Sequence, residues 1–185
     1  DKTKEHEAYQ QGIKMLGQVD STGQPKYIQA LKLFDKAVEF DSNHIESWYW
    51  KSFCELKTGQ LDKVQQTTKY VIEKFDKSNH RLLPAFYITA GLANEIRGND
   101  LKSHEYFDKA ISIYDSRLVD NNGDTDAIMN KAIVLCYMDK KPEAIKFMDS
   151  VCLKNNKNTI FADMKKQIII FEADSVLTNL KNRNN

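Results

Sequence analysis

The sequence predicts an all-α protein built from a stack of helical hairpins, on three observations. The 185 residues contain only seven glycines and three prolines, which are too few for a turn-rich β fold. Apolar residues recur every three or four positions along most of the chain, which is the spacing of one helical face. Related helix pairs also recur at about 34 residues, a spacing typical of repeat architectures. No segment alternates apolar and polar residues as a strand would.

Composition narrows the classes of partner. The chain is 41% hydrophobic, which argues against disorder, and its net charge is only +1. Such a balance gives no field that would concentrate nucleic acid, so nucleic acid is not an expected partner. No apolar run, residues 168–171 included, approaches the ~18 residues that a membrane span requires. Cys54, Cys136 and Cys152 lack metal or disulfide spacing and are expected to be buried free thiols.

The first hairpin is expected at about residues 5–43. Its first helix starts near Glu5 and carries an apolar face that ends at Val19. A cluster of turn-forming residues at 20–25 ends this helix. The second helix, residues 27–40, has apolar residues on two sides, as expected of a helix packed between two neighbours.

The next two hairpins are expected at about residues 44–78 and 84–117. In the former, helices 45–58 and 61–75 are separated by Gly59, a residue suited to a left-handed helix end. In the latter, Pro84 precedes helix 85–97, Gly98 ends it, and helix 101–114 follows.

The fourth hairpin, at about residues 125–158, pairs helix 127–138 with helix 143–153. One long capping helix is then expected within about residues 159–181, running from about 160 to 180, and it bears two apolar stripes rather than one. Extra residues near 79–83 and 118–124 interrupt the strict period and predict longer connections there.

The second helices share a pattern of a small or branched residue, a bulky residue four positions later, and a small or branched residue three positions after that. Small residues let helices approach closely while the bulky one fills the space between them. The sets are Ala30/Phe34/Ala37, Val64/Thr68/Val71, Ser103/Phe107/Ala110 and Ala144/Met148/Val151.

This pattern resembles the tetratricopeptide repeat (TPR) family, whose hairpins recur at about 34 residues with W-x₂-L-G-x₂-Y…A-x₃-F. The resemblance covers about residues 9–158. Trp48, Tyr87 and Gly91 match the family's first helix, and Gly59 matches the turn that follows it, whereas Glu55 stands where a tyrosine is usual. The resemblance implies a right-handed α-α superhelix of about four hairpins, closed by a long C-terminal capping helix.

The resemblance also implies that certain positions of the first helices line a concave groove. Trp48 then packs between helices, and a helix face of ~100° has no room for its aromatic neighbours as well. These positions are unusually apolar, which predicts a non-enzymatic protein-interaction module that binds an apolar or aromatic peptide, or an amphipathic helix, of a protein partner. The predicted groove residues are Tyr49, Trp50, Phe53, Leu56, Ile88, Leu92, Ile96, Met129, Ile133 and Tyr137.

Several alternatives stay open at this level. The groove could be filled by the chain's own C-terminal helix, or that helix could cap the stack or pair with a second copy in a homo-oligomer. Some of the predicted groove residues could instead belong to the core. Because the chain begins at Asp1, a signal or lipid anchor could have preceded it, and a structural TPR lipoprotein of a bacterial cell-envelope complex is the alternative function. Both the cytoplasm and the cell envelope are compatible with the sequence.

No catalytic, cofactor or metal site is expected. The sequence has no glycine-rich phosphate loop and no nucleophile elbow. The four histidines lack the spacing of metal ligands, and they are His6, His44, His80 and His104.

Overall fold

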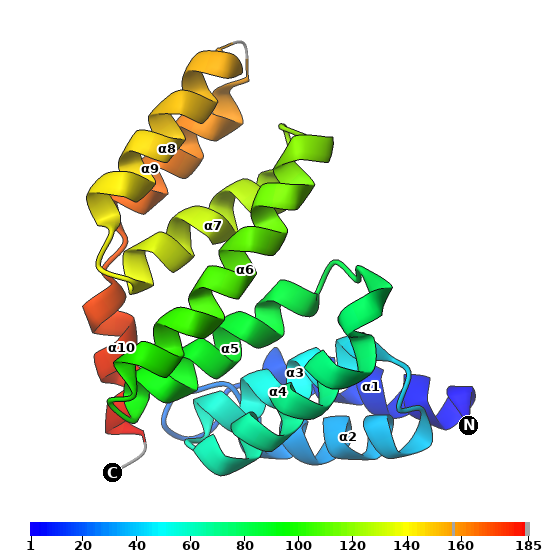
Figure 1. The fold of residues 1–185 in the computed structure, drawn as a ribbon. Coiled ribbons are helices and arrows are strands. Elements are labelled where there is room, and N and C mark those ends of the chain that lie inside the picture. The colour runs from blue at the N-terminus through cyan, green and yellow to red at the C-terminus, as the bar shows by residue number, and fades with distance from the viewer. Residues whose placement is uncertain (157, 184–185) are drawn as a thin grey trace.

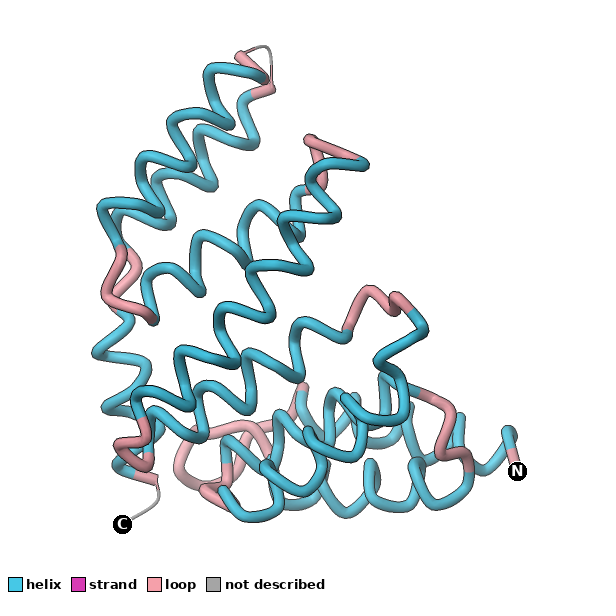
Figure 2. Tube along the Cα trace, in the orientation of Figure 1, coloured by secondary structure: helices cyan, strands magenta, loops and turns pink. Residues whose placement is uncertain are grey.

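The computed structural model describes residues 1–156 and 158–183, and it is a curved stack of α-helices joined by short loops (Figures 1 and 2). In this described part there are ten α-helices, one short 3₁₀ turn (η1, Asp76–Ser78) and no strand beyond an isolated bridge between Val19 and Pro25. The all-α prediction is therefore confirmed. None of the described helices is both long enough and apolar enough to cross a membrane.

Each helix from α1 to α8 packs against the next one along the chain, whereas α10 turns back to contact α5 and α7. The helices are α1 (Lys2–Leu16), α2 (Tyr27–Phe40), α3 (Ile45–Lys57), α4 (Leu61–Phe75), α5 (Leu83–Ile96), α6 (Asp100–Asp120), α7 (Thr125–Tyr137), α8 (Lys141–Lys154), α9 (Thr159–Ile170) and α10 (Ala173–Asn182).

Local chemistry explains where several helices begin and end. The Asp124 carboxylate accepts a hydrogen bond from the Ala127 backbone N–H and so caps the first turn of α7. Gly59 and Gly98, at φ of 74°, adopt the left-handed conformation just beyond α3 and α5. Pro84 lies in the first turn of α5, where its missing N–H costs no helical hydrogen bond.

Close packing within a hairpin is clearest between α5 and α6. A Cβ atom added to Gly91 would lie 2.4 Å from Cε1 of Phe107, so the phenyl ring lies directly on the backbone of α5. The same arrangement joins α1 to α2, where a Cβ on Gly12 would lie 2.7 Å from the ring of Phe34. Both phenylalanines are fully buried. Glycine at these positions thus permits the close helix approach that the small-and-bulky pattern requires.

Two expected helices end elsewhere. The first helix ends at Leu16, and Val19 lies outside it and is 62% exposed. Helix α6 continues past Tyr114 to Asp120, because a helical face through Arg117 and Leu118 keeps contact with α7.

The expectation of one capping helix over 159–181 is wrong: the segment forms α9 and α10, separated by extended residues Phe171 and Glu172. The Lys141 ammonium donates a hydrogen bond to the Phe171 carbonyl (2.8 Å), an acceptor that a continuous helix would have used internally. The two apolar stripes then serve different surfaces. The stripe of α9 packs against α7 and α8, and that of α10 packs in a cluster with residues of α5 and α7.

A buried carboxyl group replaces the usual tyrosine on α3. Glu55 is 1% exposed, accepts a hydrogen bond from Thr67 (3.1 Å) and lies 3.4 Å from the Lys51 ammonium. Its second oxygen has no hydrogen-bond partner within the described residues. Burial raises the pKa of Glu55, and the nearby Lys51 charge and the Thr67 hydroxyl offset that effect only in part.

The substitution Glu55→Gln is expected to raise stability at pH 8 by about 1 kcal/mol, or ~2–4 °C in Tm. A carboxyl whose folded pKa exceeds its unfolded pKa binds more protons in the folded state, so the wild type loses stability as pH rises above the unfolded pKa. Below that pKa the two proteins should melt alike. Thermal melts at pH 3.5 and pH 8 measure this, with Glu73→Gln, an exposed carboxyl of α4, as control. A lower Tm of E55Q at pH 8 would contradict it.

Candidate functional site

A cavity of about 250 Å³ lies between α3, α5, α7 and α10. We call it the groove cavity. Most of its wall is apolar, and six of the ten residues expected in the groove line it: Tyr49, Phe53, Leu56, Ile88, Leu92 and Tyr137. The remaining lining residues are Lys57, Arg81, Leu82, Ala85, Thr89, Tyr114, Asp126, Asn130, Val176 and Leu180.

The other four expected residues do not line this cavity. Trp50 stacks on Phe34, with ring centroids 6.3 Å apart, in the cluster that holds α1, α2 and α3 together. Ile96 packs against the apolar cluster that contains Leu92 of α5 and Leu180 of α10. Met129 and Ile133 pack against the cluster of α7, α8 and α9, because α9 continues the stack and covers that side of α7. These four residues therefore lie outside the groove cavity, and their part in partner binding stays a prediction.

The aromatic residues of the cavity wall are held by other rings. Tyr49 meets Trp50 edge to face at 5.0 Å and Phe86 at 6.5 Å. Phe53 meets Trp50 at 5.6 Å and Tyr27 at 6.0 Å in the same manner. Edge-to-face contacts of this kind stabilise ring orientation. Trp50 thus supports the wall from behind rather than forming it.

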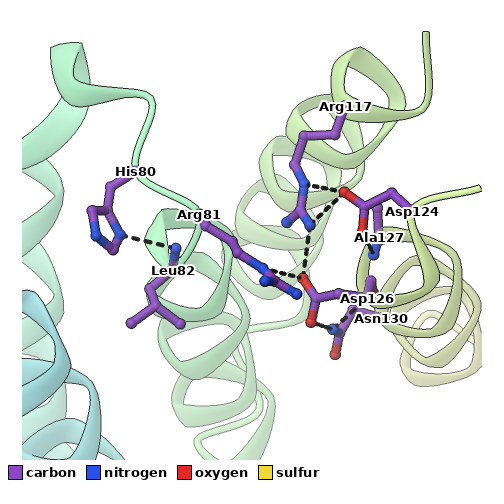
Figure 3. Close-up of polar contacts among 8 residues, drawn as sticks. All are labelled: His80, Arg81, Leu82, Arg117, Asp124, Asp126, Ala127 and Asn130. Carbon is purple, nitrogen blue, oxygen red and sulfur yellow. Dashed lines mark hydrogen bonds and ion pairs between the residues drawn. The ribbon is translucent and has the colours of Figure 1, made fainter. Parts of the chain in front are cut away.

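One end of the cavity is polar, where the N-terminal ends of α5 and α7 lie close together (Figure 3). Arg117 of α6 donates to Asp124 through Nε (2.9 Å) and Nη2 (2.7 Å), and to Asp126 through Nη2 (2.9 Å). Nε of Arg81 lies 3.6 Å from Asp126, and Asn130 donates to the same carboxylate (3.0 Å). The result is a network of two cations and two anions with an amide.

The network is balanced in charge but leaves polar groups for a ligand. Burial raises the pKa of Asp124, but the Ala127 N–H and the Arg117 guanidinium outweigh burial, and the pKa lies below its usual value. Asp124 is therefore ionised at neutral pH. The Arg81 side chain is 68% exposed at the cavity end, so its charge can reach an incoming group.

The opposite end of the cavity is closed by α10, through Val176 and Leu180. There the Tyr137 ring stacks on Phe107 at 6.0 Å and meets Phe171 edge to face at 5.6 Å. Burial raises the pKa of Tyr137 to about 12, so its hydroxyl is protonated at physiological pH.

Sequence reasoning missed the two arginines of the polar end, and it raised the C-terminal helix only as one alternative occupant of the groove. One signal was present: the two connections that interrupt the repeat period, at 79–83 and 118–124, both contribute to this end of the stack. Longer connections between repeats often lie on one binding face. Within the described residues, no three His, Cys, Asp or Glu side chains are grouped closely enough to hold a metal ion.

Comparison with known proteins supports the fold. No protein-family model matches the sequence, and no curated protein sequence matches it. Among solved structures, the chain is similar to TTC0263, a thermophilic TPR protein in Thermus thermophilus. The two share 14% sequence identity with a TM-score of 0.60, over 97% of this chain and 87% of that one. The expected TPR-like helical-repeat fold is therefore confirmed.

Proposed function

We propose that this TPR-like chain is a non-enzymatic protein-interaction module whose groove cavity holds an apolar or aromatic segment of a protein partner. The observation that carries the proposal is the cavity wall, in which Tyr49, Ile88 and Tyr137 bring apolar surface from three separate helices to one hollow. Rings behind the wall fix its shape before a ligand arrives, and a preformed site loses less entropy on binding.

The size and chemistry of the cavity favour a peptide over a free small molecule. Its volume, about 250 Å³, is below the ~300–1,000 Å³ of typical small-molecule pockets. A cavity of this size suits the anchoring side chains of a peptide or helix. The polar end adds Arg81 as donor and Asp126 as acceptor, which match backbone or charged groups next to the anchors.

The double substitution Tyr49→Ser/Phe53→Ser is expected to weaken binding of an affinity-captured partner by about 100-fold or more. Two aromatic anchors of a binding site each contribute roughly 1–2 kcal/mol or more, and tenfold in Kd corresponds to about 1.4 kcal/mol. Calorimetric titration of the full chain measures the change.

The control is Tyr70→Ser, which removes an aromatic ring from α4 that is 43% exposed and lies outside the cavity. Circular dichroism establishes that each variant is folded. An unchanged Kd in the folded double variant would refute the proposal, and an equal loss in the Tyr70 control would place the partner on another surface.

A further inference from the structure

Helix α10 packs on apolar residues that border the groove cavity. It crosses the C-terminal ends of α3, α5 and α7, and it buries Leu177 and Leu180 in the same cluster as Leu56 and Leu92. Val176 and Leu180 also form part of the wall of the groove cavity. We call the surface that α10 covers, which includes Leu56 and Leu92, the α10 seat. Because Leu56 and Leu92 also line the groove cavity, the seat and the cavity are one continuous surface.

The helix is lightly attached. Leu177 and Leu180 are its two buried residues, and most of its other side chains are exposed. Its N-cap residue, Glu172, makes no side-chain capping hydrogen bond. A helix of ten residues is marginal in isolation, so α10 depends on its seat to remain helical.

The guanidinium of Arg183, which follows α10, also makes specific contacts. Nη2 of Arg183 donates to the Gln24 side chain (2.7 Å), and Nη1 donates to the Lys57 carbonyl (3.5 Å) at the end of α3. The guanidinium carbon lies 5.8 Å from the centre of the Tyr27 ring. The C-terminus of α3, where the Lys57 carbonyl lies, favours positive charge. The seat therefore combines apolar contacts with a cation site.

The linker that precedes α10 is anchored independently of the helix. Lys141 donates to the Phe171 carbonyl and lies 3.4 Å from the Glu172 carboxylate, while Phe171 contacts Tyr137. These contacts hold the linker to α7 and α8. Residues 173–183 can therefore leave the seat while α8 and α9 stay in place.

We propose that α10 is an internal ligand, and that the partner segment is an amphipathic helix of the same pattern that displaces it. Numbered from Val176, that pattern is apolar residues at i, i+1 and i+4 with arginine at i+7. This inference rests on the proposed function and names its ligand class. The chain is then autoinhibited until a partner helix competes for the seat.

The groove cavity, which borders α10 at Val176 and Leu180, favours a foreign helix over a second copy of this chain. A second copy's α10 would make only the contacts that α10 already makes, without the advantage of being tethered by a two-residue linker. A partner helix with a larger residue at the Val176 position would add contacts in the cavity, and so would outcompete the tethered helix.

The test uses the full chain and a fluorescein-labelled peptide of residues 172–183, followed by fluorescence anisotropy. The variant Leu177→Gln/Leu180→Gln, whose own helix is released, is expected to bind the peptide at least about tenfold more tightly than the wild type. Thr178→Ala, an exposed change on the same helix, should match the wild type. A peptide carrying Val176→Phe should bind more tightly than the natural peptide, because its ring enters the cavity.

Three results would overturn the inference. They are equal affinity for wild type and released variant, no binding by the folded released variant, and a wild-type dimer in light scattering that the peptide dissociates, which would assign the seat to a second copy. If the released variant does not fold, Arg183→Ala, which alters an exposed residue, is expected to bind more tightly than wild type, and no gain would count against the inference. Failure here together with partner loss in Y49S/F53S would leave the proposed function intact.

Discussion

Replacing Phe107 with alanine is expected to lower the free energy of unfolding by about 3–5 kcal/mol. The ring is fully buried, lies on the backbone of α5 at Gly91, and stacks on Tyr137 in the cavity wall. It also belongs to the cluster that buries Leu177 and Leu180 of α10. Truncation removes apolar contacts to three helices at once, and a glycine backbone has no side chain that could fill the space.

Urea unfolding followed by circular dichroism measures this loss. Leu101→Ala provides the control on the same helix, because Leu101 is 86% exposed and its truncation should change stability by less than about 0.5 kcal/mol. A loss below about 1 kcal/mol for F107A would mean that the neighbouring helices collapse into the space.

The reverse change, Gly91→Val, is expected to cost about 3 kcal/mol through overpacking. Its Cβ would lie 2.4 Å from Cε1 and 2.7 Å from Cδ1 of Phe107, and that ring is fully buried. Gly17→Val is the matched control, since a Cβ there meets only the Lys14 carbonyl oxygen at 3.5 Å. The control should stay within about 1 kcal/mol of the wild type.

Combining Gly91→Val with Phe107→Ala provides a stringent check of this geometry. The valine should occupy space that the phenylalanine has vacated, so the double variant is expected to be more stable than the sum of the two single losses predicts. Strict additivity in urea unfolding would contradict direct contact between the two positions.

Local sequence patterns predicted most of the helices of the fold. Helices α2 and α4 begin and end at the expected residues, because turn-forming clusters and Gly59 mark those boundaries in the sequence. The break between α9 and α10 has no such marker, since no proline or glycine lies in residues 159–183. The break depends on Lys141, thirty residues away along the chain, which binds the Phe171 carbonyl. It also depends on two separate apolar clusters, because α9 packs in one and α10 in the other.

In the candidate site, too, local sequence patterns do not predict features that depend on contacts between distant segments. Cavity-lining positions on α3 and α5, such as Phe53 and Leu92, could be assigned from the repeat register. Met129 and Ile133 occupy equivalent positions on α7 but are covered by α9, and a repeat register does not specify which later helix covers a surface. Arg81 and Arg117 were missed because their roles arise from the meeting of two connections that lie far apart in the sequence.

Contacts between the last helix and the first hairpin affect how the helical array opens locally. In a linear repeat protein each hairpin contacts only its neighbours, so terminal hairpins fray independently. Here Arg183 contacts Gln24 and Lys57 across separations of 159 and 126 residues. We therefore expect the opening of the first hairpin to be coupled to that of the last helix. A partner that lifts α10 would uncouple them, and amide exchange in α1 and α2 would then report an event at the opposite end of the chain.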